Sequence, residues 1–149
     1  MKHLSIIAAA LMMLVACVSR KGPENFTTYE LSIIDGADSI MRVLTVRDSA
    51  DLAVLRSVSS DFSAEALRSD EYARLAGLMV ATVTHPSQDG VGIAGPQVGL
   101  NRRVVAVQRF DKEPVMNASG KLDHPFEVYP NIRIVCLSDS TAYGAEGCL

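Results

Sequence analysis

A glycine-rich segment in the middle of the chain restricts its fold more than any other feature. Residues 87–100 read SQDGVGIAGPQVGL, so four glycines and a proline fall within fourteen positions. Glycine and proline interrupt helices and strands, and this segment therefore cannot be regular throughout. Glycines at 90 and 92 let a ligand approach the backbone closely and can take φ values that other residues avoid. We expect a ligand-binding turn here, and the alternative is a turn with a purely structural role.

Gln97 lies just past these glycines and is the candidate catalytic side chain of the segment. Its uncharged amide has donors and an acceptor, and could bind a carbonyl oxygen that becomes negative during nucleophilic attack. Glycines at 90, 92 and 95 have the Gly-x-Gly-x-x-Gly spacing of a dinucleotide site. A predicted helix, rather than a strand, precedes Gly90, so the context does not predict such a site.

The residues before this segment predict an amphipathic helix over about 63–84. Apolar or β-branched side chains recur at helical spacing on one face: Leu75, Leu78, Met79, Thr82 and Val83. Pro86 ends the helix, since the residue before a proline is pushed out of the helical region.

Strands are expected mainly after the glycine-rich segment. Residues 104–108 (VVAVQ) predict a buried strand, and residues 126–135 predict a second extended segment that Pro130 interrupts. Residues 29–34 and 41–46 are also expected as strands or extended arms. One helix followed by several short strands predicts an α+β fold.

The beginning of the chain resembles the signal of a bacterial lipoprotein. Residues 4–15 form an apolar run that is too short to span a bilayer, for which roughly 20 residues are needed. The run leads into LVAC, with Cys17 last, as in a lipobox. We expect a signal peptide over 1–16, lipidation of Cys17, a tether over 17–28 and a domain over 29–149. The alternatives are an ordinary signal peptide or a buried N-terminal helix.

Composition does not favour a nucleic-acid surface. The chain has 14 lysines and arginines against 17 acidic residues, and no tryptophan. It therefore lacks both a basic block and an aromatic base-stacking platform, and we expect no nucleic-acid partner. Cys136 and Cys148 could form a disulfide in an exported domain, or one of them could serve a metal or catalytic role.

Two motifs resemble the signatures of peptide deformylases. Residues 90–99 (GVGIAGPQVG) resemble Gly-apolar-Gly-apolar-Ala-Ala-x-Gln followed by Val-Gly, with Gly95 in place of the second alanine. Residues 146–149 (EGCL) match the second signature, Glu-Gly-Cys-Leu-Ser, as far as they extend. The resemblance covers about 41–149. It implies a peptide-deformylase-like fold with one helix packed on short antiparallel strands.

The resemblance implies roles for the matching residues. Cys148 is implied as a ligand of a divalent metal, Fe²⁺ or Zn²⁺, which turns a bound water into a nucleophile. Gln97 and the backbone N–H of Leu149 are implied as oxyanion donors. Three residues are implied to line the substrate cleft: Val91, Gly92 and Gly147. The implied reaction is hydrolysis of the N-formyl group of N-formylmethionyl peptides.

The third signature of the family, His-Glu-x-x-His, is absent from these 149 residues. The histidines are His3, His85 and His124, and none has a second histidine four positions on. A catalytic metal needs about three protein ligands, so we expect the C-terminal metal-binding helix and two ligands to be missing here. We expect a truncated, inactive deformylase; the alternative is a noncatalytic lipid-anchored remnant or a binding protein.

Two further expectations follow from the resemblance. The third-motif helix is central in the family, so the apolar face around Leu75 is expected to lose its packing partner and the chain to fold poorly. The Cys17 signal predicts the cell envelope as the location, with a membrane as partner, whereas deformylation of nascent chains favours the cytoplasm as the alternative.

Overall fold

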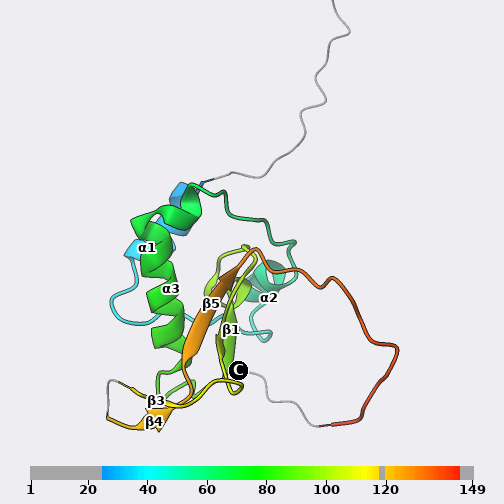
Figure 1. Cartoon of the computed structure of the whole chain (residues 1–149). Helices are drawn as coiled ribbons and strands as arrows, with labels where there is room; N and C mark the ends of the chain where they lie inside the picture. The colour runs from blue at the N-terminus through cyan, green and yellow to red at the C-terminus, as the bar shows by residue number, and fades with distance from the viewer. Residues whose placement is uncertain (1–24, 118–119, 145–149) are drawn as a thin grey trace, which may run out of the picture.

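The computed structural model describes residues 25–117 and 120–144, and most of its helices precede its short strands. In chain order they are α1 (Thr28–Asp35), α2 (Ser49–Leu55), η1 (Ala66–Arg68), α3 (Asp70–Val83), β1 (Gly92–Ala94), η2 (Gly95–Val98), β2 (Val104–Gln108), β3 (Val115–Met116), β4 (Leu122–Asp123) and β5 (Phe126–Pro130). These helices and antiparallel strands confirm the predicted α+β class (Figure 1).

Helix α3 organises the core. Ser69 caps it by accepting a hydrogen bond from the Tyr72 N–H at 3.2 Å, and the helix ends at Val83, shortly before Pro86. All five residues of the predicted apolar face are buried: Leu75, Leu78, Met79, Thr82 and Val83. Helix α1 and strands β1, β2 and β5 pack against α3. The expectation that this face lacks a packing partner is therefore wrong for this structure.

Three antiparallel strands form the main sheet in the order β1-β2-β5. Ile93 lies opposite Ala106, and Val105 lies opposite Tyr129. Along β2, the buried Val104 and Ala106 alternate with half-buried neighbours, as expected for a strand with one face on the core. Strands β1 and β5 are therefore the two edges of this sheet.

The region before α3 differs from the sequence-based expectation. Residues 29–34 lie in α1 rather than in a strand, because Thr27 and Glu30 form a capping box. The Thr27 side chain accepts from the Glu30 N–H at 3.1 Å, and the Glu30 carboxylate accepts from the Thr27 N–H at 2.7 Å. Residues 41–45 form neither helix nor strand. Helix α2 was not predicted, and Asp48 caps it.

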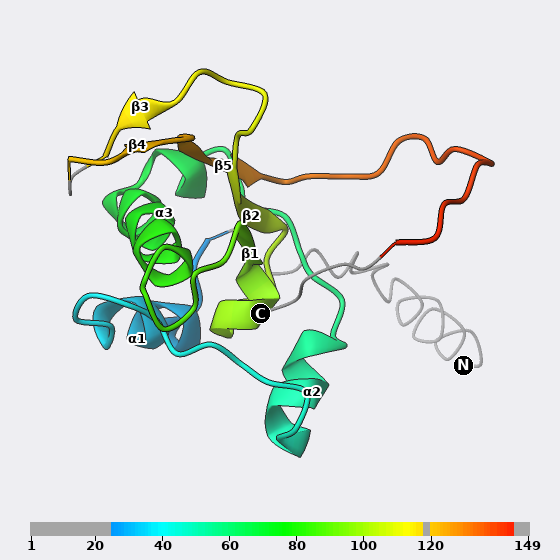
Figure 2. The ribbon, with the colours of Figure 1, turned by 90° about the horizontal axis from the view of Figure 1, so that it is seen from below.

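The region after β2 is only partly as predicted. Strand β5 ends at Pro130, and residues 131–144 contain no helix or strand. Figure 2 shows this segment leaving the sheet. Residues 109–123, between β2 and β5, contain the short pair β3 and β4. None of the helices within the described ranges is long and apolar enough to cross a membrane.

Candidate functional site

The junction of β1 and η2 holds the predicted catalytic side chain. The Gln97 carbonyl oxygen Oε1 accepts a hydrogen bond from the Ala94 N–H at 2.8 Å. This contact fixes the side-chain amide beside the strand. Its Nε2 group has no hydrogen-bond acceptor within the described ranges. The two N–H donors of a fixed, half-buried Gln97 are therefore available to a ligand.

Strand β1 presents backbone polar groups at an edge with which no other strand of the described ranges pairs. The Gln108 N–H donates to the Val91 carbonyl at 2.8 Å, and Gly92 lies opposite Val107. Antiparallel pairs alternate between bonded and non-bonded positions, so the Gly92 N–H and carbonyl point away from β2. The Ala94 N–H points the same way and is bound by Gln97. An extended peptide could therefore pair with β1 next to the Gln97 amide.

The glycines of this segment differ in their structural constraints. A Cβ at Gly95 would lie 2.7 Å from the Arg102 carbonyl oxygen, so even alanine does not fit there. Gly99 ends η2 with φ 88, a left-handed conformation that favours glycine. A Cβ at Gly92 would meet ordinary contacts of 3.4 Å. Neither packing nor φ requires glycine at 92.

A buried ion pair lies behind this segment and was not predicted. The Arg102 Nε donates to Glu30 Oε1 at 2.5 Å and its Nη2 donates to Oε2 at 2.9 Å, while Nη1 donates to the Asp61 carbonyl at 2.8 Å. The guanidinium also lies 5.2 Å from the centre of the Phe62 ring. Burial raises the pKa of Glu30, but hydrogen bonds from Arg102 and Thr27 give a net lowering of that pKa. The Thr27-x-x-Glu30 spacing is typical of a helix start and was the sequence signal available for Glu30; it does not predict the contact with Arg102.

A second group of charged side chains lies beyond the end of β2. Arg109 pairs with Asp111 at 2.6 Å and with Glu127 at 2.5 Å, and Lys112 also pairs with Glu127. The Tyr129 hydroxyl donates to the Glu127 carboxylate. Hydrogen bonds from Lys112 and Tyr129 lower the pKa of Glu127 to about 2. This group is half-exposed and consists of residues of β5 and residues that follow β2.

The described ranges do not complete a metal site. They contain no group of three or more histidine, cysteine or acidic side chains that could hold a metal ion. His85 is exposed and bonds with Ser87, and His124 bonds with the Lys112 carbonyl. Cys136 is exposed and free. The remaining predicted residues lie outside the described ranges: Cys17, Gly147, Cys148 and Leu149.

Comparisons with known proteins point to one family. A family model described as polypeptide deformylase matches residues 40–149. A peptide deformylase of Leptospira biflexa serovar Patoc is 31% identical over 96 residues, covering 64% of this chain and 51% of the relative. The chain thus spans about half the length of the curated relatives it matches.

Solved structures agree with this result. The actinonin-bound class I type b peptide deformylase of Acinetobacter baumannii has a TM-score of 0.57 at 28% identity, covering 75% of this chain and 64% of that one. The same enzyme bound to Met-Ala-Ser has a TM-score of 0.55 at 28% identity, covering 74% and 64% of the two chains. With a fixed Gln97 beside a free strand edge and a family match over 110 of its residues, this chain belongs to the peptide deformylase family.

Proposed function

We propose that this chain provides the peptide-binding edge and an oxyanion donor of a deformylase that hydrolyses the N-formyl group of N-formylmethionyl peptides. The observation that carries the proposal is the Gln97 amide, whose oxygen is held by the Ala94 N–H while its N–H donors remain available. A fixed donor of this kind stabilises negative charge that develops on a carbonyl oxygen.

The substrate is proposed to extend along β1. The outward backbone groups of Gly92 would pair with the peptide, and exposed Val91 would border it. The bound tripeptide of the A. baumannii relative supports this choice of ligand class. Gly147 and the backbone N–H of Leu149 are proposed to complete the cleft and the oxyanion site.

The family is metal-dependent, and Cys148 is proposed as one ligand of Fe²⁺ or Zn²⁺. The 149 residues contain no His-Glu-x-x-His, so they do not supply the full donor set of a catalytic site. The role assigned to these residues is therefore substrate binding and oxyanion stabilisation. We propose that the 149-residue polypeptide alone does not turn over substrate; the second candidate is a noncatalytic binding protein.

The test compares the 149-residue polypeptide with a fusion in which a deformylase segment bearing His-Glu-x-x-His follows residue 149. Both are assayed on N-formyl-Met-Ala-Ser with added Fe²⁺ or Zn²⁺. We expect hydrolysis by the fusion, loss of it on Cys148→Ala, and none by the polypeptide alone. Turnover by the polypeptide alone, or an inactive fusion that is folded and binds metal, contradicts the proposal.

We also propose that Cys17 is lipidated and that the protein is anchored in the cell envelope. The apolar run followed by LVAC supports this location. Cys17→Ala should release the protein from the membrane fraction of cells. Equal recovery of the parent and the variant as soluble protein contradicts the anchor and favours the cytoplasm.

A further inference from the structure

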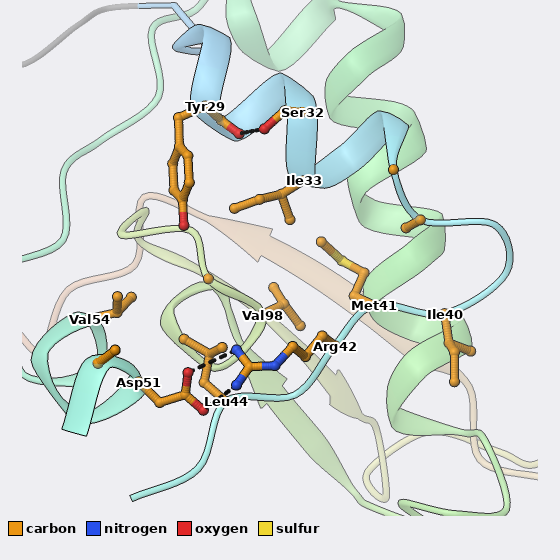
Figure 3. A pocket seen from close by; sticks show the side chains of 14 residues that line it. Tyr29, Ser32, Ile33, Ile40, Met41, Arg42, Leu44, Asp51, Val54 and Val98 are labelled. Atoms are coloured by element: carbon orange, nitrogen blue, oxygen red, sulfur yellow. Dashed lines mark hydrogen bonds and ion pairs between the residues drawn. The ribbon is translucent and has the colours of Figure 1, made fainter. Parts of the chain in front are cut away.

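A pocket of about 500 Å³ lies between α1, residues 40–44, α2 and the end of η2 (Figure 3). This volume falls within the range of small-molecule sites, about 300–1,000 Å³. The Gln97 side chain does not line the pocket. Helix α1, which forms one wall, precedes residue 40, where the family match begins. The Gln97 amide of the proposed deformylase site thus lies outside the pocket, although Val98 and Gly99 of the same segment line it.

Most of the pocket wall is aliphatic. Six large apolar side chains from four parts of the chain line it: Ile33, Ile40, Met41, Leu44, Val54 and Val98. Val98 is 2% exposed and Met41 is 3% exposed, so the floor is part of the packed core. A ligand that fills this space must be mainly apolar, because the floor offers no hydrogen-bond partners.

Two side chains with N–H or O–H donors line the solvent-facing end of the pocket: Arg42, whose side chain is 66% exposed, and Tyr29, which is 64% exposed. Arg42 Nη1 and Nη2 each donate to Asp51 at 2.8 Å. A guanidinium has five N–H groups, and the other three find no acceptor within the described ranges. Figure 3 shows the Tyr29 ring extending from α1 with its hydroxyl directed into the pocket. No hydrogen-bond partner of the Tyr29 hydroxyl lies within the described ranges.

The charge at this end is already balanced. Asp51 is 5% exposed and accepts from the Thr45 N–H at 2.9 Å as well as from Arg42. An anionic ligand would meet the Asp51 carboxylate, and a cationic ligand would meet Arg42. A neutral acceptor avoids both conflicts and can still use the spare N–H and O–H donors.

We infer that this pocket binds a neutral acyl compound, an amide or ester whose aliphatic chain lies on the Val98 floor and whose carbonyl oxygen accepts from Arg42 and Tyr29. One wall of the pocket contacts the glycine-rich segment (87–100), because the Leu44 N–H donates to the Gln97 backbone carbonyl at 2.8 Å. The inference does not depend on deformylase activity, since binding is measured without hydrolysis.

The test uses three probes of equal chain length: octanamide, octanoate and octylammonium. Each is titrated into the purified full chain, followed by ¹H–¹⁵N NMR. We expect saturable shifts around Leu44, Ala50 and Gly99, with octanamide binding at least about tenfold tighter than either ion.

Two alanines of α2 provide a matched pair of variants. Ala50 lines the pocket and Ala53, on the same helix, does not. Ala50→Trp should fill the space and weaken octanamide binding by at least about tenfold, whereas Ala53→Trp should stay within about twofold of the parent. If Ala50→Trp loses its dispersed spectrum, Tyr29→Phe replaces it and should weaken octanamide binding while octylammonium, which has no acceptor, is unaffected.

Three outcomes overturn the inference. The first is tighter binding of octanoate or octylammonium than of octanamide. The second is a set of shifts that does not saturate or that moves to the exposed apolar residues after Pro130. The third is a concentration-dependent change at Ala50 without any probe, which would show that a second copy of the chain occupies the pocket.

Discussion

Two of the groups of ion pairs among the described residues use the same chemistry in opposite surroundings. In the Glu30–Arg102 pair, the arginine side chain is 1% exposed and the glutamate side chain 10%. In the group around Glu127, the exposed fractions are 31% for Glu127, 25% for Arg109 and 44% for Lys112. The first pair joins α1 to the residues that follow the glycine-rich motif, and the second group joins the end of β2 to β5.

This difference in exposure decides how much each group contributes to the stability of the fold. When a buried charge loses its partner, no water can take the partner's place. An exposed charge, in contrast, is solvated by water and screened by salt. Arg102 also holds the carbonyl oxygens of Asp61 and Asn25, so it connects α1 with the loop before η1. The buried pair therefore supports the packing behind the proposed site, and the surface group does not.

Replacement of Arg102 should have the largest effect on stability. Arg102→Met leaves Glu30 buried without its partner and should reduce the free energy of unfolding by about 3–5 kcal/mol. The measurement is chemical denaturation followed by circular dichroism. Arg103→Met is the control, because Arg103 pairs with Asp61 at a half-exposed position. Equal losses in the two variants would contradict the distinction between buried and exposed pairs.

A methyl group at position 95 should have the next largest effect. Gly95→Ala would force a Cβ against the Arg102 carbonyl oxygen and should reduce the free energy of unfolding by about 1–3 kcal/mol. Gly92→Ala is the matched control and should leave stability nearly unchanged while it weakens peptide binding at β1. Denaturation curves of both variants check this. A larger loss from Gly92→Ala would show that Gly92 is a packing residue.

Acid should weaken the buried pair through a predictable pH range. The pKa of Glu30 lies below its usual value of 4.5. A carboxyl with a lowered pKa stabilises the fold above its unfolded-state pKa, and that stability is lost as pH falls through the folded-state pKa. Unfolding free energy should therefore fall as pH drops below 4.5, and less steeply in Glu30→Gln. Identical pH profiles for parent and variant would contradict a contribution of Glu30 to the pH dependence of stability.

The surface group should give the smallest effect. Glu127→Gln removes an exposed partner of Arg109 and Lys112, which water and salt can replace. We expect its unfolding midpoint to match that of the parent in 1 M salt, where exposed charges are screened within about 3 Å. A loss as large as that of Arg102→Met would contradict the comparison between the two groups.

The helix and the central strand could be predicted because their signals are periodic and local. The five-residue face of α3 and the VVAVQ strand match the structure for that reason. Gly95 stands where the family signature has alanine, yet its surroundings leave no space for a methyl group. That constraint depends on the Arg102 carbonyl, whose position no local pattern reveals.

The N-terminal region shows where pattern reasoning failed. Residues 29–34 were expected as a strand or arm, although the Thr27 and Glu30 capping box was visible in the sequence. The partner of Glu30 lies 72 positions away, and no periodicity predicts such a contact. The burial of the α3 face was also missed, because α1 was not foreseen as a packing partner.

The proposed role of Gln97 is tested most directly by its removal from a catalytically complete chain. In the fusion that carries His-Glu-x-x-His after residue 149, Gln97→Ala should lower kcat on N-formyl-Met-Ala-Ser by about 10²-fold or more. Gln88→Ala, in the loop before β1, is the matched control and should leave kcat unchanged. A Gln97→Ala enzyme with the kcat of its parent, while folded and metal-loaded, would contradict the assignment of Gln97 as the oxyanion donor.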